Sequence, residues 1–233
     1  MRTVTIGDTH GIAVLKIVSE IIADHDKFIF SGDYVDSFGI DNVTMKKNLL
    51  DIIELKKKYP DKIVLLWGNH DIHYLLGNEY YCSDCRPAMR YDYFEIFHSN
   101  EELFQFSLQI KDYLWTHAGL NAGWFEKRFK PFADEYKNAA SISELLNIAF
   151  SKRNPSLFDV GYIRGGSYEV GGPLWCDKSE LLSDPLKDYN QIVGHNRVKE
   201  FMTVKIHEKE IVFVDILESL EIINAEAFYY KEL

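Results

Sequence analysis

Three short apolar segments near the start of the chain share one plan, because each is followed at once by glycine and then by polar side chains. They cover residues 3–6, 27–31 and 62–67, and the clusters that follow them read GDTHG, GDYVD and GNHD. Short apolar segments bounded by glycine are typical of strands that are buried on both faces. The pattern therefore predicts three buried strands, each with polar residues at its end.

Between these strands, apolar residues recur at helical spacing over residues 12–24 and 43–58. The second segment has Asp41 or Asn42 as its candidate N-cap, and it ends in three lysines followed by a Tyr-Pro pair. Strands that alternate with helices in this way indicate a parallel sheet.

The second half of the chain has a different pattern. Residues 121–150 have a mostly helical pattern, and residues 154–175 are rich in glycine and predict loops. Strand-like segments cover residues 104–115, 190–193, 202–207 and 211–216, with two more strands expected within residues 218–231. They predict a second, mainly antiparallel sheet packed against the first. No linker-like tract interrupts the sequence, so residues 1–233 are expected to form a single domain.

Composition places the chain among globular proteins. Of its 233 residues, 46% are apolar and 14% aromatic, which suffices for a sizeable core, and the formal net charge is −10. Nucleic-acid-binding proteins usually carry a basic excess, so the charge argues against that partner. The first residues, MRTVTIGD, lack a signal-peptide pattern, and no apolar run approaches the ~18 residues of a membrane span. A cytoplasmic protein without membrane contact is expected.

Three cysteines, Cys82, Cys85 and Cys176, do not make a disulfide framework in a chain of this length. Cys82 and Cys85 form a C-x-x-C pair. Such a pair is either part of a metal or redox site or two ordinary reduced thiols, and the sequence offers no second pair.

The polar clusters lie where a parallel sheet places its ligands, at the carboxyl ends of the strands. Two later segments, HAG at residues 117–119 and GHN at residues 194–196, add histidines after apolar runs. The residues expected to converge carry oxygen and nitrogen donors: Asp8, His10, Asp33, Asn69, His117 and His195. Imidazole suits zinc and iron, whereas carboxylate suits manganese and magnesium. Six donors are too many for one catalytic zinc, but they suffice for two ions that share a carboxylate.

Each piece of this pattern also has a structural interpretation. A Gly-Asp pair alone is usually a turn, and an isolated histidine is usually a hydrogen-bonded structural residue, which is the interpretation given to His25, His98 and His207. Five strand ends that each carry glycine within two residues of Asp, Asn or His are hard to explain as turns.

Taken in order, the motifs GDTHG, GDYVD, GNHD, HAG and GHN resemble those of the calcineurin-like metallophosphoesterases. Within that superfamily they are most similar to the phosphoprotein phosphatase branch and to the symmetrical diadenosine tetraphosphatases. The motifs span residues 7–196, most of the chain. The resemblance implies an α/β sandwich of two packed, mixed β-sheets flanked by helices. It also implies two divalent metal ions at the strand ends, with manganese expected and iron or zinc as alternatives.

The resemblance assigns roles to individual residues. Asp8 and His10 would hold the first ion, and Asp33 would bridge both ions. The second ion would be held by three residues: Asn69, His117 and His195. A water or hydroxide between the ions would attack phosphorus.

The same resemblance assigns an acid. His70 would protonate the leaving oxygen, and Asp36 would orient its imidazole. His73 is expected near a helix start in a structural or surface position, and Asp71 is expected to cap that helix.

The sequence departs from the protein phosphatase pattern at two arginines, where it has Ser37 and Trp67. Arginine binds phosphate oxygens at two points, so its loss needs a replacement. The candidates are Arg164, Arg197 and Lys178. The segment GGPLWCD is similar to a Leu-Trp-x-Asp stretch of protein phosphatases, which would place two further residues at the rim of the cleft, Trp175 and Asp177.

Three functions remain open on the sequence. The leading hypothesis is a phosphomonoesterase that acts on phosphoproteins, as a serine/threonine protein phosphatase does. The motifs GNHD and HAG are similar to those of the tetraphosphatases, so the alternative is a dinucleoside polyphosphate hydrolase with a nucleotide substrate. The third is a metal-binding interaction module that has lost catalysis, which the missing arginines would suggest.

Overall fold

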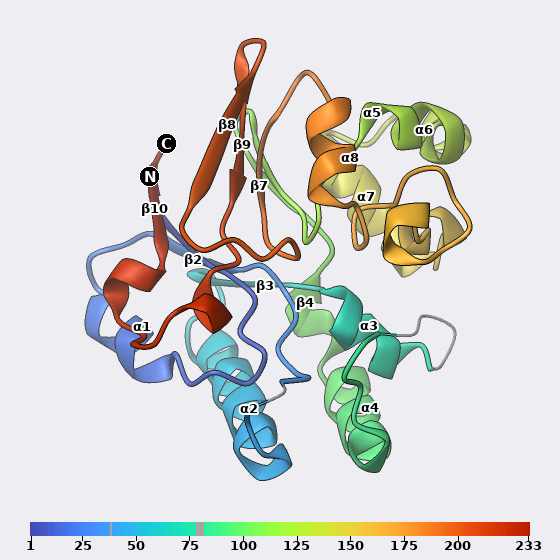
Figure 1. Ribbon diagram of the computed structural model, residues 1–233. Coiled ribbons are helices and arrows are strands. Elements are labelled where there is room, and N and C mark those ends of the chain that lie inside the picture. The colour runs from blue at the N-terminus through green and yellow to red at the C-terminus, as the bar shows by residue number, and fades with distance from the viewer. Residues whose placement is uncertain (38, 78–81) are drawn as a thin grey trace.

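The computed structural model describes residues 1–37, 39–77 and 82–233. Two five-stranded sheets pack face to face through apolar side chains, and helices flank them (Figure 1). The fold class predicted from the sequence, two packed mixed sheets flanked by helices, is confirmed.

The first sheet has the strand order β10-β1-β2-β3-β4, in which β1 to β4 run parallel and β10 lies antiparallel to β1. Its strands are β1 (Arg2–Ile6), β2 (Lys27–Phe30), β3 (Ile63–Leu66), β4 (Phe104–Gln105) and β10 (Tyr229–Glu232). Phe28 and Phe30 pack in the same core as residues of the helices, whereas Ile29 between them packs against the second sheet. Both faces of β2 are therefore apolar, which explains its unbroken hydrophobic pattern.

The second sheet has the strand order β5-β6-β7-β9-β8. Its strands are β5 (Leu108–Ile110), β6 (Tyr113–Trp115), β7 (Asn190–Val193), β8 (Met202–Ile206) and β9 (Lys209–Phe213). The pairs β6–β7 and β7–β9 are parallel, and the pairs β5–β6 and β8–β9 are antiparallel. The expectation of a mainly antiparallel sheet is thus wrong, because the long helical connection between β6 and β7 allows a parallel crossover.

Helices lie in the connections between the strands. The α-helices are α1 (Leu15–Ile21), α2 (Asn42–Lys58), α3 (Asn69–Leu75), α4 (Arg90–Ser99), α5 (Ala122–Trp124), α6 (Lys130–Glu135), α7 (Ile142–Ser151) and α8 (Lys178–Ser183). The side chain of Asp41 accepts hydrogen bonds from the first turn of α2, so the predicted N-cap is confirmed. Across the described residues, no helix combines the length and apolarity that a bilayer span requires.

The end of the chain differs from expectation. Within residues 218–231 two strands were predicted, but only β10 forms, and it joins the first sheet. Before it, the chain makes two 3-10 turns, Leu217–Ser219 and Ala225–Ala227. The side chain of Asn224 accepts a hydrogen bond from the backbone of Glu226, and such local bonding competes with strand pairing.

Candidate metal centre

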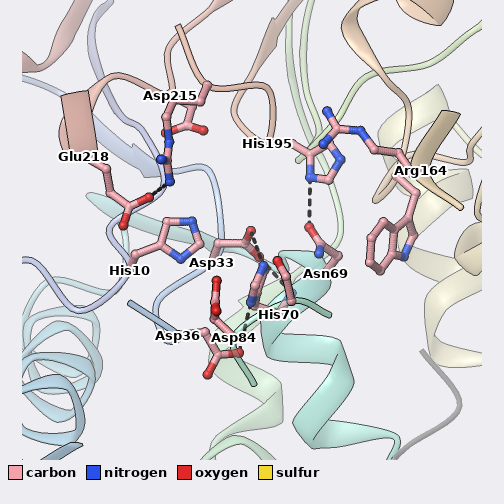
Figure 2. A pocket seen from close by; sticks show the side chains of 13 residues that line it. His10, Asp33, Asp36, Asn69, His70, Asp84, Arg164, His195, Asp215 and Glu218 are labelled. Carbon is pink, nitrogen blue, oxygen red and sulfur yellow. Dashed lines mark hydrogen bonds and ion pairs between the residues drawn. The ribbon is translucent and has the colours of Figure 1, made fainter. Parts of the chain in front are cut away.

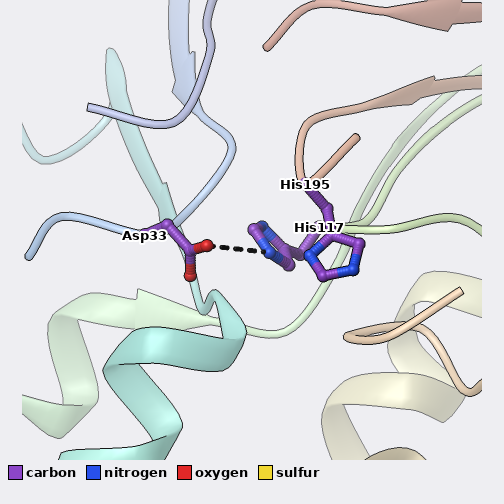
Figure 3. Close-up of side chains that lie close together, drawn as sticks. All are labelled: Asp33, His117 and His195. Atoms are coloured by element: carbon purple, nitrogen blue, oxygen red, sulfur yellow. Dashed lines mark ion pairs between the residues drawn. The ribbon is translucent and has the colours of Figure 1, made fainter. Parts of the chain in front are cut away.

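Five strands, β1, β2, β3, β6 and β7, lead into the loops that carry the predicted metal ligands. The donor atoms of these loops form two groups, and within each group they lie within 4.8 Å of one another. The first group contains Asp8, His10 and Asp33, and the second contains Asp33, His117 and His195. Asp33 belongs to both groups, and Figure 3 shows it facing His117.

Asn69 completes the second group. Its Oδ1 lies 2.8 Å from Nε2 of His117 and 2.9 Å from Nδ1 of His195, and Figure 2 shows the contact with His195. Adjacent corners of an octahedron with bonds of ~2.1 Å lie about 3 Å apart. Both distances from the Asn69 oxygen are therefore those expected between neighbouring ligands of one small cation.

Backbone carbonyls orient two of the histidines. Nδ1 of His10 lies 2.9 Å from the carbonyl oxygen of Val35, and Nδ1 of His117 lies 2.8 Å from that of Ser31. A carbonyl accepts a proton from Nδ1, so Nε2 of each ring is left as the metal-binding atom.

Glycines let the chain approach the carboxylates. A Cβ on Gly194 would lie 2.0 Å from Oδ1 of Asp8, and a Cβ on Gly68 would lie 2.1 Å from Oδ1 of Asp33. No other residue fits at either position without displacing a predicted ligand. The glycines of the motifs thus serve packing at the site.

Four predicted site residues have left-handed backbone conformations. The φ angles are 42° at His10, 52° at Asp33, 68° at Asp36 and 60° at His195. Such conformations cost roughly 1–3 kcal/mol each in residues other than glycine, and they cluster at functional sites. At each strand end the chain turns sharply, and the left-handed conformation directs the side chain toward the centre.

The charges at the centre fit a cation. Asp8 and Asp33 are buried, and burial together with the charge of Asp215 raises the pKa of Asp8 well above its usual value. Oδ1 of Asp215 is buried and has no hydrogen-bond partner among the residues that the structure describes. Divalent ions would neutralise the carboxylates and use such donors, so the residues present fit the metals that the motifs imply.

His70 forms a separate pair with Asp36. Its Nδ1 lies 2.9 Å from Oδ2 of Asp36, and Oδ1 of Asp36 accepts a hydrogen bond from the Tyr74 hydroxyl at 2.6 Å. Nε2 of His70 lies 4.0 Å from Oδ2 of Asp33, so the ring stands between Asp36 and the metal groups. Burial alone would lower the pKa of His70, but Asp33 and Asp36 raise it above its usual value. The ring is therefore suited to carry a proton.

Two further polar residues of α3, Asp71 and His73, are not part of the metal groups. Asp71 is fully buried, and its carboxylate accepts backbone N–H bonds from Gly68, Asp33 and Tyr34, which confirms the predicted cap. His73 is buried inside α3 rather than on the surface.

An open pocket of about 300 Å³ gives access to the centre (Figure 2). Its walls include six predicted residues: His10, Asp33, Asp36, Asn69, His70 and His195. Asp8 and His117 lie buried outside the lining of this pocket.

The predicted substrate contacts divide into two sets. Arg164, Arg197 and Trp175 line the pocket, whereas Asp177 does not. Nε of Arg164 lies 3.1 Å from Oδ2 of Asp177, and Arg197 forms an ion pair with Glu218. The structure thus brings both arginines to the site, each beside a carboxylate.

The two residues that stand in place of the protein phosphatase arginines, Ser37 and Trp67, do not offer a phosphate-binding side chain at the pocket. Trp67 is buried in the core and stacks on Phe104, with ring centroids 4.4 Å apart. The carbonyl of Ser37 accepts a hydrogen bond from Arg86, which is not among the pocket residues. Lys178 also lies outside this pocket.

Sequence reasoning missed four residues that line the pocket: Ser83, Asp84, Asp215 and Glu218. Asp215 had a usable signal, because it follows the apolar run of β9 as the other ligands follow their strands. The other three lie in loops and turns whose sequence carries no comparable pattern.

The C-x-x-C pair lies beside the centre. Sγ of Cys82 lies 3.2 Å from Nδ2 of Asn69 and donates to the carbonyl of the same residue. Neither candidate metal group in the described part of the chain includes a cysteine. The pair therefore gains no support as a metal site.

Comparisons with known proteins give one family. A family model described as calcineurin-like phosphoesterase matches residues 1–210. No match was found among curated proteins.

Solved structures with a similar fold include phosphatases. A cold-active protein-tyrosine phosphatase of the psychrophile Shewanella sp. has a TM-score of 0.51 at 19% identity, over 92% of this chain and 71% of that chain. A mutant cold-active protein tyrosine phosphatase has a TM-score of 0.50 at 18% identity, over the same shares. A protein serine/threonine phosphatase from Saccharomyces cerevisiae has a TM-score of 0.41 at 17% identity, over 94% of this chain and 56% of that chain. At these identities the likeness shows the fold alone.

Proposed function

The chain belongs to the calcineurin-like phosphoesterase family and is a metal-dependent phosphoric ester hydrolase, and we propose that it hydrolyses phosphate monoesters on phosphorylated serine or threonine. The observation that carries the proposal is the pair of donor groups that share Asp33, with His70 on their open side. Asp8 and His10 would hold one ion, Asp33 would be shared between the two, and the second ion would be held by Asn69, His117 and His195. Two divalent ions bound there supply the positive charge that stabilises the phosphoryl group in transfer.

His70 acts as the general acid in this proposal. Asp36 accepts a hydrogen bond from Nδ1 and stabilises the imidazolium form, whose second proton, on Nε2, is the one available to the pocket. The Tyr74 hydroxyl occupies the other oxygen of Asp36 and keeps the carboxylate in place. The imidazole gives its proton to the leaving oxygen, a step that typically contributes 10²–10⁴ to the rate.

Arg164 and Arg197 bind the phosphate oxygens from the rim. Nη2 of Arg164 donates to Oδ1 of Asn196 at 2.6 Å while its Nε faces Asp177, so the guanidinium is held from two sides. Such a fixed fork is the geometry in which arginine recognises phosphate. These two residues replace the arginines that the sequence lacks beside its motifs.

Manganese is the proposed ion. The donor set combines carboxylate, amide and imidazole, which suits manganese, while iron and zinc fit the imidazoles. Elemental analysis of protein purified without added metal tests the assignment, and zinc or iron at two ions per chain would replace it.

One observation favours a second candidate, the hydrolysis of dinucleoside polyphosphates. Trp175 lines the pocket together with Arg164, and an aromatic wall can stack on a nucleobase. The third hypothesis, a metal-binding module without catalysis, gains no support because the His70–Asp36 pair is complete.

The test compares substrates at equal concentration with the manganese-loaded protein. Phosphoserine, phosphothreonine and phosphotyrosine peptides are supplied separately, and diadenosine tetraphosphate is supplied as the nucleotide. Phosphate release from the first two peptides supports the proposal. Release of adenosine diphosphate with all peptides intact would instead establish the second candidate, and a chelator-treated sample serves as the control.

A further inference from the structure

A basic groove adjoins the metal pocket. It has a volume of about 540 Å³, and the residues that define it include Lys178, Arg197, Lys199, Glu200, Phe201 and Thr203. Arg197 lines both the groove and the metal pocket, so the two hollows adjoin at this side chain. Three cationic side chains and one carboxylate line the groove, and Arg197 among them is paired with Glu218, so Lys178 and Lys199 supply its positive charge although the chain as a whole has a formal charge of −10.

The backbone connects the two hollows directly. The segment 195–199 begins at the predicted ligand His195, passes Arg197 at the border and reaches Lys199 in the groove. Four residues span at most ~14 Å when fully extended. The cationic groups of the groove therefore lie within reach of a group attached close to a phosphate bound at the metal centre.

Asn196 fixes the other side of this connection. Its buried side chain accepts hydrogen bonds from Nη2 of Arg164 at 2.6 Å and from the backbone N–H of Lys178 at 2.8 Å. The arginine of the pocket and the lysine of the groove thus share one anchor. Neither Lys178 nor Lys199 forms an ion pair within the residues that the structure describes, so both charges are available.

We infer that the groove binds a second anionic group of the substrate, placed beside the phosphate that is cleaved; this inference rests on the proposed function. In a phosphopeptide the group is a carboxylate or a second phosphate within about four residues of the phosphorylated side chain, by the extended reach of a chain. In a nucleotide it is a further phosphate. Both sources present the same chemistry, an anion that faces Lys178 and Lys199.

The experiment measures binding and turnover separately. Two fluorescent phosphoserine peptides are compared, one with glutamate and one with glutamine at the flanking positions, in manganese at low salt. Dissociation constants are measured by anisotropy on the His70→Asn background, in which turnover is slow, and initial rates are measured with His70 intact. The variants are Lys178→Ser, Lys199→Ser and their combination, and Lys205→Ser is the matched control because Lys205 is an exposed lysine outside the groove.

The acidic peptide is expected to bind about tenfold tighter than the neutral one. Each groove substitution should reduce this preference about two- to fivefold, the combination should abolish it, and Lys205→Ser should leave it unchanged. Raising the salt should reduce the preference in the same direction. A preference that survives the double substitution, or that is absent from the start, overturns the inference.

The outcomes separate the inference from the proposed function. Peptide hydrolysis without a lysine-dependent preference rejects the groove and leaves the phosphatase in place. Lysine-dependent binding without hydrolysis supports the groove and rejects the phosphatase. Unlabelled diadenosine tetraphosphate is also tested as a competitor of the labelled peptide. If its competition depends on the two lysines while binding of the glutamate peptide does not, the second anion is a phosphate.

Discussion

The metal centre and the rim of the pocket are built in different ways. The centre contains buried residues that closely follow strands, namely Asp8, Asp33 and His117. A backbone carbonyl orients His117, and a glycine packs closely against each of the two carboxylates. Arg164 ends a 3-10 turn and Arg197 comes from a loop; both are at least partly exposed, and carboxylate partners position them. The centre has one geometry because the strands impose it, whereas the rim depends on side-chain pairs that a substrate can exchange.

This difference separates chemistry from selection. The centre is built from the motifs that resemble those of the calcineurin-like metallophosphoesterases, and the rim carries the two arginines proposed to replace those that this chain lacks beside its motifs. Substitutions at the centre should change metal content and rate, and substitutions at the rim should change the substrate that is accepted. The predictions below test that division.

The largest effect is expected from Asp33→Asn. Asp33 belongs to both donor groups, and an amide lacks the charge that two cations require, so the variant should lose both ions and its activity. Metal content is measured by elemental analysis after dialysis. Asp24→Asn, at an exposed position, removes the same charge elsewhere and should keep both ions. A variant of Asp33 that retains two ions would refute its shared position.

His70→Asn tests the other half of the centre. The variant should keep both ions, because His70 belongs to neither donor group, and turnover should fall about 10²–10⁴-fold. The loss should be greatest with alkoxide leaving groups and smallest with acidic phenols, which leave without a proton. Metal loss on this substitution would mean that His70 is a ligand.

Arg164→Ala tests the rim. A charge-assisted hydrogen bond is worth about 1.5–3 kcal/mol, so kcat/KM should fall roughly 10–100-fold while metal content is unchanged. The same substitution at Arg2, an exposed residue of β1, is the control. If Arg164→Ala also released metal, the centre and the rim would not be separable parts.

The sequence predicts the centre better than the rim for a physical reason. Asp8, Asp33 and Asn69 follow apolar strands and adjoin glycine, so strand pattern and turn chemistry mark them locally. Their convergence needs only the rule that parallel strands end at one edge. The convergence of the six predicted ligands thus follows from local pattern and topology, and their binding of metal stays a prediction.

The rim has no such local mark. Glu218 and Asp84 reach the pocket from a 3-10 turn and a loop, and only the folded chain brings Glu218 beside Arg197. The prediction of two strands within residues 218–231 was wrong for a related reason. A local hydrogen bond of Asn224 favours a turn there, and only β10 forms. The position of a loop relative to distant residues cannot be predicted from a short stretch of sequence.

The smallest effect is expected from Asp177→Asn, which weakens the ion pair that holds Arg164. Burial alone would raise the pKa of Asp177, but hydrogen bonds from Ser179 and the charge of Arg164 hold it below its usual value. A carboxyl whose folded pKa is lowered stabilises the fold above its unfolded pKa of about 4, and this stabilisation disappears as the pH falls through the folded pKa.

Asparagine retains the helix cap of α8 and removes only the charge, so the loss at pH 7 should be about 0.2–1 kcal/mol, or roughly 1–3 °C in Tm. The difference from the original protein should shrink as the pH falls from 5 to 3. Thermal unfolding at both pH values measures it, with the exposed Asp188→Asn as control. A difference that persists at pH 3 would show that Asp177 acts through packing and not through its charge. The rim would then be held by packing, as the centre is.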